Sequence, residues 1–176
     1  DPDDVRRAIR PNTRLLVTTH ASNVVGTLLP IAMLAALART WEISYLVDAA
    51  QTAGLVPIDV EALGVDLLAF TGHKGLLGLT GTGGLYIRDG LPLAPLLRGG
   101  TGSDSELEVQ PAFLPDAYES GTRNVAGLAG LAAGVKLLNE IGVEQIQAHE
   151  EALTAYFLDG AQEIPSLTVY GPADST

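Results

Sequence analysis

The sequence predicts an α/β fold built around a mainly parallel sheet. Short, continuously apolar segments alternate with longer segments of helical periodicity, which is the order of elements in a layered α/β sheet. The apolar segments lack the polar alternation of a half-exposed sheet, as expected for parallel strands buried on both faces. The chain has 176 residues, of which 47% are hydrophobic and 18% charged, so it can form the core of one domain or of part of a larger one.

The chain opens with a helix and a strand. A short helix is expected over residues 1–9, because Asp1 suits the N-cap, Pro2 lies in the first turn, and arginines follow the early acids. Pro11 and the asparagine after it end this helix. Residues 14–19, Arg-Leu-Leu-Val-Thr-Thr, then form a buried strand.

A second helix and a second strand follow. The polar turn His20–Asn23 precedes a helix that is expected from about Leu29 to Thr40. Residues 43–47, Ile-Ser-Tyr-Leu-Val, form the second buried strand, which runs directly into Asp48-Ala-Ala-Gln51.

Two further strands are expected before a long connection. Residues 66–70 form the third strand, and residues 84–87 form a fourth that is only one loop away, which allows the two to pair antiparallel. Residues 91–121 are rich in proline, glycine and serine and have little periodicity. Long connections of this kind are more often functional than idle.

Two helices and a strand complete the chain. A helix over residues 125–142 carries Gly127 and Gly134 on one face, where another backbone could approach closely. A second helix covers residues 143–163, and residues 166–170 are expected to begin a further strand whose sheet is not visible in this chain. The apolar face predicted for the first of these helices consists of Val125, Leu128, Leu131, Val135 and Leu138.

Charge and composition exclude several classes of partner. The net charge of −11 argues against nucleic acid, because phosphate binding needs clustered lysines and arginines. The longest apolar run, Leu28–Ala38, is interrupted by Pro30 and is shorter than the ~20 residues that span a bilayer, so no membrane partner is expected. The absence of cysteine fits a cytoplasmic protein. The chain starts at Asp1 and stops just after an apolar run, which suggests a fragment.

Polar residues follow three of the predicted strands, at Thr19–Asn23, Asp48–Gln51 and Thr71–Lys74. Taken singly, such an aspartate is often a helix cap and such a lysine a surface charge. Ligands of open α/β sheets, however, bind beyond the carboxyl ends of the strands, so the three segments are expected to converge on one crevice.

A pyridoxal phosphate site needs these residue types together. A lysine amine forms the Schiff base with the aldehyde, and lysine can lose its proton where arginine cannot. A carboxylate opposite the pyridine nitrogen keeps that nitrogen protonated, and nearby donors hold the phosphate and the ring hydroxyl. Lys74, one of two lysines in the chain, and Asp48 are the candidates for the first two roles.

Other catalytic patterns are absent from the sequence. The glycine-rich segment after Lys74 contains neither the P-loop pattern nor G-x-G-x-x-G after a strand, and no G-x-S-x-G occurs. His20, His73 and His149 are scattered without metal-ligand spacing, so no metal is expected.

Five motifs in order along the chain carry a specific resemblance. They are Thr19-His-Ala-Ser-Asn-Val-Val-Gly26, Val47-Asp-Ala-Ala-Gln51, Thr71-Gly-His-Lys-Gly75, Gly99-Gly-Thr-Gly102 and Glu119-Ser-Gly-Thr-Arg-Asn124. With these motifs the sequence resembles the class V aminotransferase family of pyridoxal-phosphate enzymes, especially its cysteine desulfurase and selenocysteine lyase group.

The resemblance implies fold type I, with a mainly parallel large domain, a small α+β C-terminal domain, and a homodimer with the cofactor near its interface. Residues 1–124 would be the C-terminal part of the cofactor-binding large domain, residues 125–142 a connecting helix, and residues 143–176 the truncated start of the small domain. The family also carries a phosphate loop upstream of this region, and downstream an arginine for the substrate carboxylate.

The resemblance assigns roles to individual residues as well. Lys74 and His73 would be the catalytic residues, and Thr71 stands where many relatives have serine. Arg123 receives no role and is expected at an interface or on the surface, and Lys136 is expected on a solvated helix face. The implied cofactor contacts are Lys74 as the Schiff-base lysine, His73 and Thr71 at the phosphate, Asp48 at the pyridine nitrogen, Gln51 at the ring hydroxyl, Asn23 near the ring and the substrate carboxylate, and Thr122 at the phosphate of the neighbouring subunit.

The activity implied is that of a cysteine desulfurase, which converts L-cysteine to L-alanine and transfers the sulfur to an enzyme cysteine, here outside this chain. A sulfur-acceptor protein is a further partner that the resemblance implies. The same residues serve an aminotransferase, an epimerase or a selenocysteine lyase of class V equally well. A catalytically inactive fragment that folds without cofactor is the further alternative.

Overall fold

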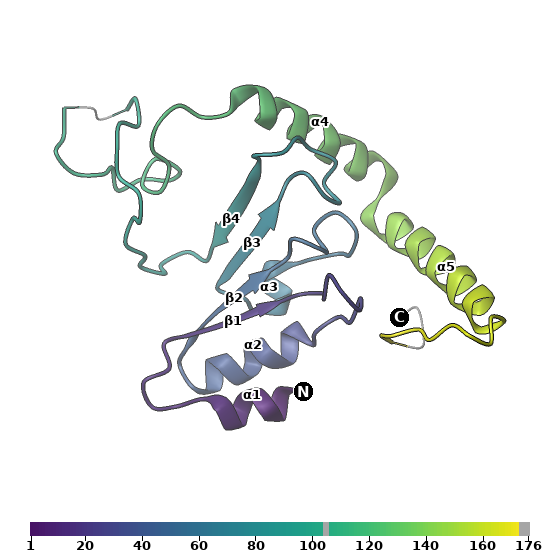
Figure 1. Ribbon diagram of the computed structural model, residues 1–176. Helices are drawn as coiled ribbons and strands as arrows, with labels where there is room; N and C mark the ends of the chain where they lie inside the picture. Colours follow the sequence, from purple (N-terminus) through teal and green to yellow (C-terminus); the bar gives the residue numbers. More distant parts are fainter. Residues whose placement is uncertain (104–105, 173–176) are drawn as a thin grey trace.

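The computed structural model describes residues 1–103 and 106–172 and contains one mixed sheet. Its strands are β1 (Leu15–Thr19), β2 (Ser44–Asp48), β3 (Leu67–Thr71) and β4 (Gly83–Ile87), in the spatial order β1-β2-β3-β4 (Figure 1). Strands β1 to β3 are parallel, and β4 is antiparallel to β3. The predicted α/β class and the antiparallel fourth strand are therefore confirmed.

Three helices accompany the first three strands. They are α1 (Pro2–Ala8), α2 (Ile31–Thr40) and α3 (Val60–Leu63). The Asp1 side chain accepts a hydrogen bond from the backbone NH of Asp3, so it caps α1 as predicted. Helix α2 packs against β2 and contacts both α1 and α3.

The core lies between α2 and one face of the sheet. Tyr45, Val47 and Leu68 project from that face and are buried against apolar residues of α2. Strand register places Leu15, Val17 and Leu85 on the opposite face, where all three are exposed. Within this chain the sheet is therefore covered well on one face only.

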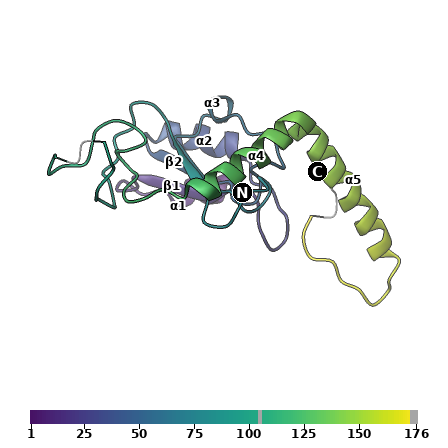
Figure 2. The same ribbon diagram turned by 90° about the horizontal axis from the view of Figure 1, so that it is seen from above.

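Two long helices lie beyond the sheet. Helix α4 (Val125–Ile141) and helix α5 (Val143–Gln162) meet at Gly142 with an angle of 81° between them. Figures 1 and 2 show α5 directed away from the sheet, at the opposite end of the molecule from the segment that joins β4 to α4. No single helix in the described ranges is long and apolar enough to cross a bilayer, and α4 with α5 would satisfy length and composition only as a bent pair.

The buried face of α4 differs in part from the predicted one. Gly127, Gly134 and Leu138 are buried, whereas Val125 and Leu128, which were expected on that face, are exposed. The difference arises because α4 packs on a loop through its glycines, so the face that makes contact is centred on small residues.

The C-terminal segment pairs with none of the strands β1 to β4. Residues 166–170 run as irregular chain after α5, and the strand expected there, with its sheet outside this chain, stays a prediction. Their apolar side chains face the loop after β1 and not a neighbouring strand: Val169 and Tyr170 line one cavity with Val25. Apolar β-forming residues alone do not make a strand where no sheet edge lies within reach.

The segment between β4 and α4 is held by its own polar contacts. Arg123 forms ion pairs with the buried Asp116 and with Glu119, and the Tyr118 hydroxyl donates to the backbone oxygen of Leu93 at 3.1 Å. Arg123, which received no role from the sequence, therefore stabilises the last part of this connection, residues 116–123, and its side chain is exposed as expected.

Candidate functional site

The carboxyl ends of three parallel strands lie side by side at one edge of the sheet. Asp48 pairs in register with Thr19 of β1 and with Ala69 of β3. The backbone NH of His20 donates to the oxygen of Asp48, and the NH of Ala49 donates to the oxygen of Ala69, each at 2.8 Å. The three polar segments predicted to converge on one edge therefore do so.

The segment after β2 forms a tight turn that carries two of the predicted residues, Asp48 and Gln51. The backbone NH of Ala50 donates to Asp48 Oδ1 at 2.9 Å, and the NH of Ala53 donates to the oxygen of Ala49 at 2.9 Å. The Asp48 carboxylate remains exposed, and Gln51 is half-buried one turn further on.

A buried histidine that the sequence did not single out supports this turn. The Nδ1 atom of His20 lies 2.9 Å from Oγ1 of Thr52, and both residues are buried. Burial lowers the pKa of His20, since the charged imidazolium would lose its hydration. His20 thus links the end of β1 to the turn that follows β2, directly beside Asp48.

The segment after β3 carries the lysine. Oγ1 of Thr71, the last residue of β3, lies 2.7 Å from Nδ1 of His73, so the two residues assigned to a phosphate are already paired. The side chains of His73 and Lys74 are exposed. An exposed amine is free to reach a ligand at this edge.

A short closed loop follows the lysine. The backbone NH of Leu77 donates to the oxygen of Lys74 at 2.9 Å, and the NH of Gly78 donates to the oxygen of Gly72 at 2.7 Å. Leu77 adopts a left-handed conformation with a φ of 58°. Residues 72–78, called the lysine loop below, therefore form a closed loop whose first and last residues are hydrogen-bonded to each other.

A cavity of about 670 Å³ opens beside the segments that follow β1 and β2, and neither Asp48 nor any residue of 71–78 lines it. Asn23 and Gln51 line it from the sheet side, and Glu150 and Phe157 of α5 and Tyr170 line it from the other. Two of the predicted cofactor contacts thus face one space.

Thr122 is not part of that group. It is exposed in the segment before α4, next to Gly121, whose backbone NH donates to the oxygen of Gly100 at 2.8 Å, and it does not line the cavity that Asn23 and Gln51 share. Its predicted role concerns a neighbouring subunit and stays a prediction.

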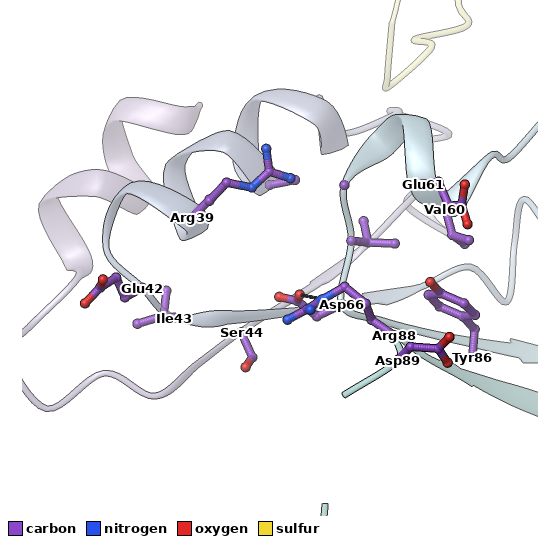
Figure 3. Close-up of a pocket in the computed structure, with 13 residues that line it drawn as sticks. Arg39, Glu42, Ile43, Ser44, Val60, Glu61, Asp66, Tyr86, Arg88 and Asp89 are labelled. Atoms are coloured by element: carbon purple, nitrogen blue, oxygen red, sulfur yellow. Dashed lines mark hydrogen bonds and ion pairs between the residues drawn. The ribbon is translucent and has the colours of Figure 1, made fainter. Parts of the chain in front are cut away.

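A second cavity, of about 740 Å³, lies at the opposite edge of the sheet (Figure 3). Ser44 at the start of β2 and Arg88 just after β4 line it, and Arg88 Nε is 2.6 Å from Asp66 Oδ1. None of the predicted site residues lines this cavity, so its volume does not mark it as the reactive edge.

The residues at the carboxyl edge fit pyridoxal phosphate by their chemistry. They supply an exposed amine, an exposed carboxylate on the neighbouring strand, a hydroxyl–imidazole pair, and two amide side chains on a shared cavity. These are the groups that would bond the aldehyde carbon, hold a proton on the ring nitrogen, and donate to the phosphate and hydroxyl oxygens.

Comparison with known proteins places the whole chain in one family. A family model described as Aminotransferase class-V matches residues 1–176. A protein of Methanothermobacter thermautotrophicus named "Probable cysteine desulfurase" is 39% identical over 175 residues, which cover 97% of this chain and 44% of that protein.

Solved structures resemble the chain over nearly its whole length. The cysteine desulfurase CsdA of Escherichia coli superposes with a TM-score of 0.83 at 30% identity, covering 99% of this chain and 45% of that one. A structure described as SspA in complex with cysteine has a TM-score of 0.65 at 33% identity, covering 77% of this chain and 36% of that one. The chain therefore spans less than half the length of these similar proteins.

Proposed function

The chain belongs to the class V aminotransferase family, and from this premise we propose that it is part of a pyridoxal-phosphate-dependent cysteine desulfurase. The observation that carries the proposal is that Asp48 and the lysine loop leave neighbouring parallel strands at the same edge of the sheet. Relatives named as cysteine desulfurases, and a related structure described as a complex with cysteine, support the choice of substrate.

The cofactor, when bound, supplies an electron sink that stabilises negative charge on the substrate carbon atoms. In the proposed site the Asp48 carboxylate holds the proton on the cofactor's ring nitrogen, and Thr71 and His73 bind the phosphate. Asn23 and Gln51 orient the ring through their amide groups. The proposed site thus draws its contacts from the ends of three neighbouring strands, β1, β2 and β3.

Lys74 has two tasks in this proposal. Its Nζ binds the cofactor covalently in the resting enzyme, and after release by the substrate amine it moves protons at the substrate carbon atoms. Both tasks need a side chain that can move, and the exposed, unbranched side chain of Lys74 on its short loop allows this.

The overall change proposed is transfer of sulfur from cysteine to a thiol. The carbon–sulfur bond of L-cysteine breaks, L-alanine is formed, and the sulfur atom joins an acceptor thiol as a persulfide, so no external oxidant or reductant is needed. The chain has no cysteine, so the acceptor thiol is supplied from outside these 176 residues. A homodimer, in which Thr122 would reach the partner's phosphate, belongs to the same proposal.

The decisive experiment separates cofactor attachment from turnover. Full-length protein is incubated with pyridoxal phosphate, reduced with borohydride, digested, and analysed by mass spectrometry for modification at Lys74. Alanine and sulfide released from cysteine in the presence of a thiol reductant are then measured. Lys74→Ala should abolish attachment and lower turnover by about 10²–10⁴-fold or more.

Lys136→Ala is the matched control, because Lys136 is the other lysine and lies exposed on α4 with an ion pair to Glu140. It should keep both attachment and turnover. Attachment at Lys74 without release of sulfide would instead favour amino-group transfer or epimerisation. Absence of attachment would contradict the proposed function altogether.

A further inference from the structure

The lysine loop is in backbone contact with the turn that presents Asp48 and Gln51. A Cβ atom added at Gly54 would lie 2.6 Å from the carbonyl oxygen and 2.7 Å from the carbonyl carbon of Gly75, the residue after Lys74. Gly54 also has a φ of +86°, which side-chain-bearing residues rarely adopt. Glycine is therefore required at this point for two independent reasons.

The contact is reciprocal. A Cβ atom added at Gly75 would lie 2.6 Å from the carbonyl oxygen of Ala53 and 2.7 Å from Cγ of Leu55. Both neighbours of Gly54 in the chain thus touch Gly75 in turn. Because the obstructing atoms at each glycine include backbone, a change of side-chain rotamer cannot relieve the overlap.

A second glycine contact holds the loop from the side of α4. A Cβ atom added at Gly134 would overlap the carbonyl oxygen of Leu76 and lie 3.3 Å from Cβ of Leu77. Leu76 and Leu77 therefore pack against the backbone of α4, and Gly75 packs against the turn after β2. The lysine loop lies between these two surfaces and contacts both, an arrangement called the clamp below.

We propose that Gly54 and Gly134 are positioning residues for Lys74, because their missing side chains set the distance of the lysine loop from the turn that carries Asp48. This inference rests on the proposed function for the meaning of Lys74, and it adds what holds that residue in place. A side chain at either glycine pushes the loop by its backbone, so the lysine moves relative to Asp48 without any change in its own chemistry. A displacement of about 1 Å can cost on the order of 10²-fold in a reaction that depends on orientation.

The test uses full-length protein and two glycine substitutions with matched controls. Gly54→Ala is paired with Gly90→Ala, since Gly90 has a similar φ of +78° but no atom within 4 Å of an added Cβ. Gly134→Ala is paired with Gly160→Ala, since Gly160 lies in α5 and also faces open space. Each control reproduces the change in backbone preference without the overlap.

Two measurements are made on each protein. Hydrogen exchange of residues 72–78 is followed without cofactor, and the rate of borohydride-trapped attachment of pyridoxal phosphate at Lys74 is measured relative to non-specific attachment at Lys136. We expect Gly54→Ala and Gly134→Ala to accelerate exchange in the loop and to slow attachment at Lys74 by about 10- to 100-fold. The controls should stay within about twofold of wild type.

Wild-type exchange and attachment rates in both Gly54→Ala and Gly134→Ala would overturn the inference. If Gly54→Ala does not fold, Gly134→Ala decides alone, because alanine favours a helix and this variant retains the helical propensity of α4. If the wild-type protein shows no attachment at Lys74, the proposed function fails, whereas hydrogen exchange of the unloaded protein still decides whether the two contacts hold the loop.

Discussion

Replacing Thr52 by valine should destabilise the turn beside the lysine loop out of proportion to the atoms removed. Valine has nearly the shape of threonine but lacks the hydroxyl, and Thr52 is only 2% exposed. Its Oγ1 lies 2.9 Å from Nδ1 of His20, which is itself 8% exposed. The substitution therefore leaves a buried ring nitrogen without this partner, while the packing is almost unchanged.

The expected loss follows from that unpaired nitrogen. A buried polar group deprived of its partner costs about 1–3 kcal/mol. The other contact of the Thr52 hydroxyl, to the oxygen of Ala49, is long at 3.5 Å and contributes little. We therefore expect Thr52→Val to lower the free energy of unfolding by about 2 kcal/mol.

Urea denaturation of the full-length protein without cofactor, followed by circular dichroism at pH 7.5, measures this loss. Thr40→Val is the control: Thr40 also bonds through its hydroxyl to a backbone oxygen, at 2.9 Å, but lies exposed on α2, so its loss should be below about 0.5 kcal/mol. The double variant His20→Leu with Thr52→Val should lose less than the sum of the two single variants, since no polar group then remains unpaired. A Thr52→Val protein as stable as Thr40→Val would refute the reasoning.

Three further predictions concern stability. Burial lowers the pKa of His20 below its ordinary value of 6.5, so below that pH the unfolded chain binds a proton that the folded chain does not. The contribution of His20 to the free energy of unfolding should be fully present above pH 6.5 and fall as the pH is lowered, by no more than about 1.4 kcal/mol per pH unit for one proton. His20→Leu should remove this part of the pH dependence in urea titrations. Asp66→Ala should lower the free energy of unfolding by about 1–3 kcal/mol, because Asp66 Oδ2 accepts a hydrogen bond from the backbone NH of the buried Tyr45 at 2.9 Å. Arg88→Ala removes only the half-exposed ion-pair partner of Asp66 and should lower it by less than about 1 kcal/mol (Figure 3). Equal losses for the two variants in urea denaturation would count against this account. Leu34 is only 2% exposed and packs against the sheet, so Leu34→Ala should lower the free energy of unfolding by about 2–5 kcal/mol and the thermal midpoint with it. Met33→Ala, at a neighbour that is 61% exposed, should leave the thermal midpoint nearly unchanged. A similar shift in both variants would contradict the assignment of the core.

The local pattern of the sequence was sufficient for most of the fold. The continuous apolar runs before Asp48 and Thr71 predicted parallel strands, and the short connection to residues 84–87 predicted the antiparallel fourth strand. The spacing of Gly127 and Gly134 predicted a close backbone contact on α4, and Gly134 makes one with Leu76. These features depend on spacing along the chain, which a sequence displays directly.

Features that depend on tertiary contact could not be predicted in the same way. The pairing of His20 with Thr52 joins two strand ends whose separation in space is fixed only by the sheet. The short helix α3 was missed because one turn capped by Asp59 gives no periodic signal. The strand expected at residues 166–170 has no neighbouring strand within the described part of this chain and stays a prediction, because propensity alone does not supply a partner.

The assignment of roles to single residues has a different basis. The motifs around Asn23, Asp48 and Lys74 predicted which polar segments meet at one edge of the sheet, since strand ends converge whatever the family. The role of each residue there came from the resemblance, and physical reasoning on the residue types was compatible with it. Neither approach predicted the ion pairs of Arg123, because they form within an irregular segment that has no helical or strand periodicity.

The clamp on the lysine loop makes the position of the lysine a late product of folding. Gly134 and Leu76 are far apart in sequence, so their contact forms only after a large loop has closed, later than the adjacent β3–β4 hairpin. Helix α4 also contains three glycines, each about 1 kcal/mol less favourable than alanine in a helix, so α4 depends on docking for its order. During synthesis the ribosome releases the lysine well before the helix that fixes it. A nascent chain that has not yet added α4 therefore contains Lys74 without the contact that fixes its loop.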